Sequence, residues 1–102
     1  MARVTRTQLA TRDLEEIGEH IARESQSRTV AIQFLDSIDQ KIQLYATQPE
    51  MGERRPDLGP DVRQFSIGYY VVLYRPTAAG VELARVLHGS RNISSVWWRS
   101  EG

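Results

Sequence analysis

The 102-residue chain contains no cysteine and no long run of apolar residues. The absence of cysteine excludes a disulfide framework and a thiolate-bound metal ion. No stretch approaches the roughly 20 apolar residues that a membrane-spanning helix needs, and the opening sequence, MARVTRTQLATRD, lacks the apolar segment of a signal peptide. We therefore expect a cytoplasmic protein that does not associate with membranes.

The chain also lacks net charge, because thirteen basic residues balance thirteen acidic ones. Without a strongly cationic surface, direct binding of nucleic acid is not expected. Histidine is scarce as well. His20 and His88 are distant in sequence and fit no metal-ligand spacing, so we predict neither a metal site nor a cofactor. We interpret His20, near the expected end of a helix, as interacting with the helix dipole.

What the chain does contain is the apolar periodicity of two amphipathic helices. Thr7 can cap the first helix, which is expected to run to about Glu24. A second helix is expected from about Arg28 to Thr47, and Pro49 ends it. The short break between the two helices predicts an antiparallel hairpin whose apolar stripes pack against another layer.

Strands are expected on both sides of the helical hairpin. A short strand is expected at residues 2–6, before the first helix. An irregular loop is expected after the second helix, at 49–61. Three further strands then follow at 62–65, 69–75 and 81–88, with a turn at 66–68 between the first two of them. The predicted fold class is α+β, a single domain over residues 1–102 with a short N-terminal strand and a helical hairpin on a small antiparallel sheet. Both alternating sets in YYVVLYR (69–75) are apolar, so something should also cover the second sheet face.

Two stretches, RQFSIGYYVVLYR (Arg63–Arg75) and GVELARVLHGSR (Gly80–Arg91), are similar to the strand region of ParE toxins in the ParE/RelE superfamily. DLEEI (13–17) and PEMGERRPDL (49–58) also resemble family stretches, so the resemblance spans nearly the whole chain. It implies the toxic half of a bacterial toxin–antitoxin module. It also implies one of two activities, since ParE-type members poison DNA gyrase and RelE-type members cut messenger RNA in the ribosome.

The residues favour the gyrase poison over the nuclease. Metal-free RNA cleavage needs a base, an acid and cations on the phosphorane. RelE-type proteins supply lysines, arginines and usually a C-terminal tyrosine, whereas this chain has Arg54 and Arg55 in its middle loop and Trp97 or Trp98 at the late aromatic position. Indole offers no useful titratable proton. His88 remains, but VLHG resembles the ParE-like branch, where this histidine is not regarded as catalytic. We predict no catalytic residue, with an mRNA endonuclease as the alternative.

The resemblance implies that the target is the gyrase A subunit, held in the state in which DNA is cleaved. We expect target contacts from arginines and aromatics around the last strands, namely Arg63, His88, Arg91, Trp97 and Trp98. The arginines can instead pair within the fold, for instance with Glu82 or Asp61, and this is favoured for Arg75 and Arg85. One of the two tryptophans is expected to point outward, although both could cap the core.

The resemblance further implies a ParD-like antitoxin that forms a hetero-oligomer with the toxin. The implied mode of binding is an antitoxin segment that folds as it binds, wraps the toxin and lays an amphipathic helix along an apolar groove. The candidates for antitoxin contact are apolar positions with no evident core role and the doubly apolar strand, namely Val30, Leu44, Tyr69, Val71, Leu73 and Arg75. Burial inside the toxin itself explains these positions equally well.

Overall fold

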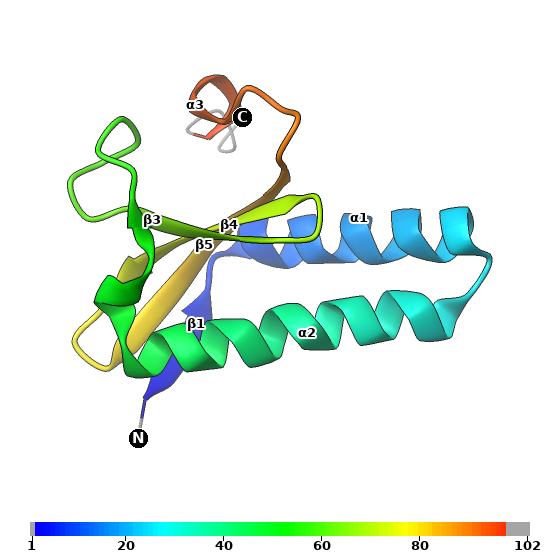
Figure 1. Cartoon of the computed structure of the whole chain (residues 1–102), viewed down its shortest axis with the longest axis horizontal. Helices are drawn as coiled ribbons and strands as arrows, with labels where there is room; N and C mark the ends of the chain where they lie inside the picture. Colours follow the sequence, from blue (N-terminus) through cyan, green and yellow to red (C-terminus); the bar gives the residue numbers. More distant parts are fainter. Residues whose placement is uncertain (1, 98–102) are drawn as a thin grey trace.

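Two long helices lie on one face of a five-stranded sheet in the computed structural model, which describes residues 2–97 (Figure 1). The strand order is β1-β5-β4-β3-β2. In chain order the elements are β1 (Arg3–Arg6), α1 (Gln8–Ser25), α2 (Arg28–Thr47), the 3-10 turn η1 (Pro49–Met51), β2 (Glu53–Arg54), β3 (Arg63–Ile67), β4 (Tyr70–Pro76), β5 (Gly80–His88) and α3 (Ile93–Val96). The predicted α+β fold is confirmed.

The helices begin and end where their capping residues require. The Thr7 hydroxyl accepts a hydrogen bond from the Ala10 amide at 3.0 Å and donates one to the Ala84 carbonyl at 2.7 Å. One side chain thereby caps α1 and ties it to β5. Gln26 adopts a left-handed conformation after α1, and Ser27 caps α2 through the Val30 amide. These caps fix the tight link that makes the two helices antiparallel neighbours.

The sheet is mixed, because β1 joins it in parallel with β5 while all the other neighbours are antiparallel. The antiparallel arrangement predicted for the later strands is therefore correct, and β1 is the exception. The turn predicted at 66–68 is displaced. Ser66 and Ile67 still pair within β3, and the chain reverses at Gly68, whose φ of 58° suits glycine. Strand β2, inside the loop expected at 49–61, was not predicted.

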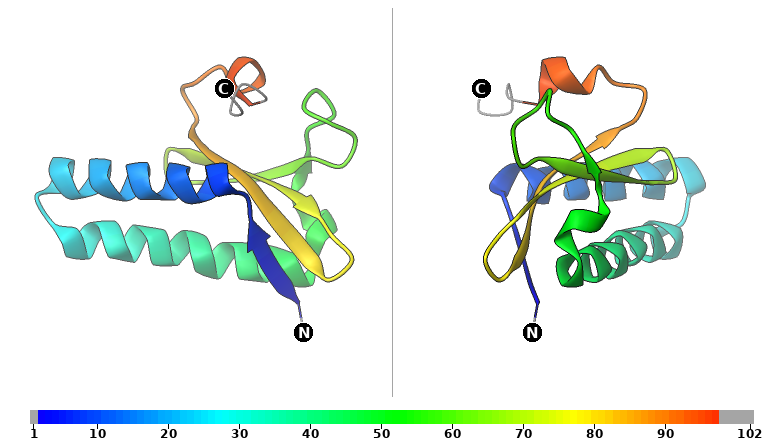
Figure 2. Two further views of the ribbon diagram at one scale, coloured as in Figure 1. Left: turned by 180° about the vertical axis from the view of Figure 1, so that it is seen from behind. Right: turned by 60° about the vertical axis from the view of Figure 1, so that its left-hand side comes forward.

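The chain itself covers both faces of the sheet. On the helical face, Ile38 and Ile42 of α2 pack with Val72 and Tyr74 of β4. On the opposite face, Leu73 packs in a second apolar cluster with Val62, Leu87 and Ile93. The loop before β3 and the short helix α3 supply this second cover, above the sheet in Figure 1 and again in both views of Figure 2. The doubly apolar strand β4 is thus a central strand with a core on each side.

Tyr74 joins this core to the turn that follows α2. The side chain is fully buried; its hydroxyl donates to the Pro49 carbonyl at 2.7 Å and accepts from the Gly52 amide at 2.9 Å. Burial raises the pKa of Tyr74 above its usual value, because the phenolate would lose its hydration. The neutral phenol therefore contributes stability that is complete below pH 10 and declines as the pH rises above it.

We expect Tyr74→Phe to lower the free energy of unfolding by about 1–3 kcal/mol, because it leaves the buried Gly52 amide and the partly buried Pro49 carbonyl without this partner. Urea denaturation at neutral pH measures this loss. Tyr70→Phe is the matched control, since the hydroxyl of half-buried Tyr70 makes no hydrogen bond to the described residues. A loss no larger than that of the control would contradict the assigned hydrogen bonds.

Candidate functional site

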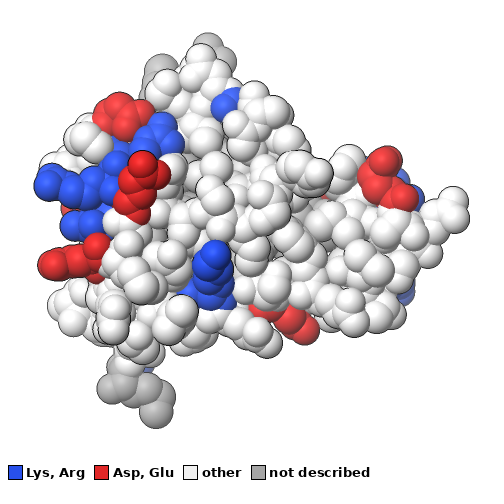
Figure 3. Space-filling model, in the orientation of Figure 1, with Lys and Arg blue, Asp and Glu red and all other residues white. Residues whose placement is uncertain are grey.

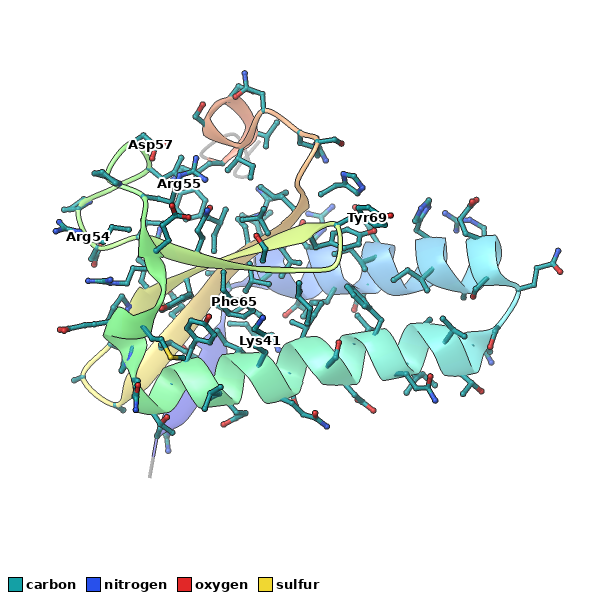
Figure 4. All side chains as sticks on the ribbon, viewed as in Figure 1. Lys41, Arg54, Arg55, Asp57, Phe65 and Tyr69 are labelled. Carbon is teal, nitrogen blue, oxygen red and sulfur yellow. The ribbon has the colours of Figure 1, made fainter. Side chains whose placement is uncertain are left out.

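An aromatic surface patch forms where the β3–β4 turn meets the end of β5. The Tyr69 ring, 81% exposed, stacks on the His88 ring with centroids 6.1 Å apart and planes 11° apart. The Tyr70 ring meets His88 edge-on at 5.3 Å and continues to Phe34 at 5.5 Å. Figure 4 shows Tyr69 at this end of the sheet. Exposed, ordered aromatic rings are typical of protein-binding surfaces.

His88 is held in place by the turn that follows β5. The Ser90 amide donates to His88 Nδ1 at 3.1 Å, and the Ser90 hydroxyl lies 2.7 Å from the same atom. Because Nδ1 accepts the backbone hydrogen bond, the proton of neutral His88 resides on Nε2. His88 therefore hydrogen-bonds to the backbone of its own turn. This hydrogen bond fixes the His88 ring, on which the Tyr69 ring stacks.

A small hollow of about 130 Å³ opens beside the aromatic patch, between α1 and the end of β5. Arg91 and His88 line it together with His20 and Glu16 of α1. Arg91 is exposed, and its side chain makes no hydrogen bond or ion pair within residues 2–97. The structure therefore brings together two of the predicted target-binding residues, His88 and Arg91, and adds two that the sequence did not suggest.

His20 lies five residues before the end of α1, outside its last turn. The helix-dipole interpretation of His20 is therefore wrong, because that effect falls off within one turn. Its neighbours across the hollow come from residues about seventy positions later in the chain. No local signal in the sequence indicates such a pairing, and only the register of α1 against β5 creates it.

A salt bridge between Asp13 and Arg85 joins α1 to β5 beside the hollow that Asp13 helps to line. Arg85 Nε donates to Asp13 Oδ2 at 2.7 Å and Nη2 donates to Oδ1 at 2.9 Å, while the Val86 amide also donates to Oδ2 at 3.0 Å. Strand β1 ends opposite Leu83, so no strand pairs with β5 beyond that residue on this edge. The Asp13 carboxylate accepts the hydrogen bond of the Val86 amide there instead. Hydrogen bonding to Asp13 raises the pKa of Arg85 despite burial. The structural role expected for Arg85 is correct.

Arg63 lies at the other end of the sheet and holds the chain after α2. Its Nη1 donates to the carbonyls of Glu50 and Gly52, both at 2.9 Å. This geometry favours the structural alternative for Arg63 over a role in target contact, and it places Arg63 away from the aromatic patch. Charged side chains gather at this end, and positive and negative ones are interleaved there in Figure 3.

The two arginines of the middle loop are also far from His88. Arg55 pairs with Asp57 at 2.8 Å and donates to Gln64, whereas Arg54 is exposed on β2 with no side-chain partner among the described residues. Hydrogen bonding to Asp57 raises the pKa of Arg55, and the same hydrogen bond lowers the pKa of Asp57. Figure 4 shows Arg54 and Arg55 at the opposite end of the sheet from Tyr69, so these cations do not converge with the histidine.

Arg75 is paired within the fold, as favoured from the sequence. Its Nη1 donates to Glu82 at 3.0 Å, and its guanidinium carbon lies 5.3 Å from the Trp97 ring centroid. Half-buried Trp97 packs with the second core cluster, which corresponds to the core-capping alternative. The neighbouring Trp98, also predicted to contact the target, lies outside the described residues.

The predicted antitoxin-contact residues do not form one surface. Val30 and Leu44 are 44% and 57% exposed on α2. Val71 is half-buried and Leu73 is fully buried, and both belong to the second core cluster. The loop before β3 and α3 cover that face of β4, so Leu73 is inaccessible to a partner. The prediction that Leu73 contacts the antitoxin is therefore wrong.

Metal-ligating side chains do not cluster in the described part of the chain. Within residues 2–97, no group of three or more histidine or acidic residues is placed to hold a metal ion, and no helix is both long and apolar enough to cross a bilayer. Lys41, the single lysine, donates to the Ser66 carbonyl at 3.2 Å and lies 5.4 Å from the Phe65 ring centroid. Figure 4 shows this pair between α2 and the sheet, away from Tyr69.

Comparison with known proteins identifies the family. The model that describes the ParE toxin of the type II toxin–antitoxin system parDE matches residues 4–93. The chain belongs to the ParE toxin family. The predicted resemblance is thereby confirmed, and both the aromatic patch and the Asp13–Arg85 pair lie within the matched residues.

One curated relative agrees with membership of the ParE family, and one solved structure shares the fold. Toxin ParE3 of Caulobacter vibrioides is 32% identical over 95 residues, which cover 93% of this chain and 94% of that protein. A solved chain described as the chromosomal ParDE TA system from P. aeruginosa superposes with a TM-score of 0.72, covering 86% of this chain and 96% of that one. At 19% identity the second likeness supports the fold alone.

Proposed function

We propose that this ParE toxin inhibits DNA gyrase by binding its A subunit in the cleaved-DNA state, and that a ParD-like antitoxin neutralises it. Such a toxin needs no chemistry of its own, because preferential binding of one gyrase state shifts the population of states. The toxin would act in the cytoplasm. The observation that carries the proposal is the patch of Tyr69, His88 and Arg91, which presents exposed aromatic area and an unpaired cation beside it.

The RelE-type endonuclease has one observation in its favour, which is that His20, His88 and Arg91 line the same hollow. The rest of the molecule argues against it. Nδ1 of His88 accepts a hydrogen bond from the Ser90 amide, and Arg54 and Arg55 lie at the far end of the sheet. On His88 itself, only Nε2 is left for proton transfer. The geometry supports a binding surface better than an acid–base site.

Purified toxin incubated with gyrase, plasmid and ATP should yield linear DNA trapped in a covalent complex. We expect Arg91→Glu to reduce trapping about tenfold at equal toxin concentration, as expected for losing one important contact in a buried interface. Arg54→Glu is the matched control, because it makes the same charge change on an exposed arginine at the opposite end of the sheet.

Two results would overturn this proposal. One is an equal loss of trapping in the Arg91 and Arg54 variants, which would mean that charge alone matters. The other is an absence of trapping at high toxin concentration, together with transcripts cut in the ribosome by wild-type toxin and left intact by His88→Ala. The second result would establish the endonuclease instead.

A further inference from the structure

The hollow between α1 and the end of β5 is small, and it combines an apolar floor with a charged rim. Its volume of about 130 Å³ is below the roughly 300–1,000 Å³ of a site for a drug-sized ligand, so it suits one small chemical group. Buried and half-buried apolar residues form the floor, namely Ile17, Tyr70, Val86 and Leu87. Charged and titratable side chains form the rim, namely Asp13, Glu16, His20, His88 and Arg91. We call it the Arg91 hollow.

Asp13 adds no free charge to the Arg91 hollow. Its carboxylate accepts two hydrogen bonds from the Arg85 guanidinium and one from the Val86 amide. Since Arg85 carries the balancing positive charge, the pair is neutral as a unit. The formal charges that remain are those of Arg91 and Glu16. Both residues are exposed, and neither side chain makes a hydrogen bond or an ion pair within residues 2–97.

Arg91 and His88 are two hydrogen-bond donors on the rim whose acceptor is not supplied by residues 2–97. The guanidinium of Arg91 is a planar fork of N–H groups, which matches a carboxylate in bidentate geometry. On neutral His88 the proton resides on Nε2, because Nδ1 accepts from the Ser90 amide, so the remaining ring nitrogen is also a donor. An acceptor that carries negative charge would satisfy both side chains.

The charge balance of the Arg91 hollow favours a single carboxylate over a phosphate backbone. Nucleic acid carries many negative charges and is bound by cationic surfaces, whereas this chain has no net charge. Glu16 lies on the same rim and repels every further negative charge that approaches. One acidic side chain brings one charge, and its methylene groups gain free energy by covering the apolar floor.

We propose that the Arg91 hollow accepts one aspartate or glutamate side chain of the target protein, with its carboxylate held by the Arg91 guanidinium and the Nε2–H of His88. This inference rests on the proposed function and specifies which chemical group of the target occupies the site. Glu16 acts as an internal competitor. It lowers the affinity for any anion and thereby restricts the hollow to a ligand that carries one charge.

The test is a nuclear magnetic resonance titration of the full toxin with propionate, which reproduces the carboxyl end of a glutamate side chain. Low ionic strength keeps the charge interaction unscreened. We expect propionate to shift the guanidinium resonance of Arg91 and the ring resonances of His88, and to leave the guanidinium resonance of Arg54 unchanged. Propionate should bind at least about tenfold more tightly than uncharged propionamide.

Two pairs of variants test the roles of the charges. Arg91→Gln should weaken propionate binding about tenfold, because the charged fork is lost. Its matched control is Arg54→Gln, on an exposed arginine at the opposite end of the sheet in Figure 4, which should bind as the wild type does. Glu16→Gln should tighten binding about threefold, because a like charge is removed. Glu24→Gln, on the same helix and outside the hollow, should change nothing.

Three results would overturn the carboxylate site. Equal affinity for propionate and propionamide would show that charge is not recognised. Equal affinity of the Glu16 and Glu24 variants would remove the internal competitor. A short DNA duplex that shifts the Arg91 and His88 resonances at a lower concentration than propionate does would assign the hollow to phosphate instead.

Failure of the carboxylate site is distinguishable from failure of the gyrase proposal, because the titration contains no gyrase. Propionate bound at Arg91 in a toxin that traps no cleaved DNA would support the site and refute the proposed target. Trapping that is lost in Arg91→Glu, in a toxin that does not bind propionate, would overturn the carboxylate site and support the target.

Discussion

Replacing Asp13 by asparagine is expected to lower the free energy of unfolding by about 3 kcal/mol. The two side chains of the Asp13–Arg85 pair are only 11% and 12% exposed, so the change strands a poorly hydrated guanidinium without a countercharge. One asparagine oxygen cannot replace two carboxylate oxygens that accept three hydrogen bonds. Urea denaturation at neutral pH measures the effect.

The matched control is Glu82→Gln, which breaks the Arg75–Glu82 pair. Its side chains are 38% and 36% exposed, so water screens the charges and the loss should stay below about 1 kcal/mol. Both variants remove one carboxylate from an arginine pair that includes a residue of β5, and the Asp13–Arg85 pair is the more buried of the two. Equal losses would show that Asp13 is not the anchor between α1 and β5.

The Asp13–Arg85 pair also bears on function. It fixes α1 against β5 at the point where Glu16 and His20 face His88 and Arg91. A variant weakened there should change the shape of the hollow before the whole molecule unfolds. Loss of gyrase trapping in Asp13→Asn would therefore be indirect, and it must be compared with Arg91→Glu at temperatures where both variants are folded.

The helices and most strand positions could be predicted because their signals are local. Thr7 caps α1, Pro49 follows α2, and YYVVLYR has the β-branched and aromatic composition of a buried strand. The prediction that the second face of β4 needs a cover was also local, since it used the alternation of that strand alone. The sequence does not predict which segment provides the cover, because nothing in the residues around Val62 and Ile93 indicates that they pack on β4.

Strand β5 shows why the site was harder to predict than the fold. Simple alternation would put Val86 and Leu83 on opposite faces, yet both pack against the helices. A bulge shifts the register between Leu73–Arg85 and Tyr74–Leu83, so side-chain direction changes within the strand. Arg85 lies at this bulge and pairs with Asp13, 72 residues earlier. Sequence spacing carries no information about such a contact.

The binding surfaces follow the same rule. His88 and Arg91 were both predicted as target contacts, and the structure places them in one hollow. Glu16 and His20 of α1 line the same hollow but come from a distant part of the chain, so no motif marks them. The antitoxin surface predicted from unused apolar positions contained core residues, since an apolar residue in a sequence does not reveal which side of it is covered.

Replacing Gly80 by alanine is expected to lower the free energy of unfolding by about 3 kcal/mol and to release β1 from the sheet. A Cβ at position 80 would overlap the carbonyl oxygen of Arg3 and lie 2.7 Å from its amide nitrogen. These are backbone atoms of the paired strand, Arg3 opposite Gly80 in parallel register, so no side-chain rotation relieves the clash. Only separation of β1 from β5 does.

Hydrogen exchange distinguishes this local release from a general loss of stability. In Gly80→Ala, the amides of residues 3–6 should exchange far faster than those of β4, whereas a global effect would accelerate both together. Gly18→Ala is the matched control: its Cβ would meet only the flexible end of Leu35, and alanine is favoured in a helix by about 1 kcal/mol. Its stability should therefore change by less than about 1 kcal/mol. If Gly80→Ala kept both its stability and its protected β1 amides, the close parallel pairing of β1 with β5 would be refuted. That pairing ends at Leu83, and this is why the Val86 amide, further along β5, donates to Asp13 instead of to β1.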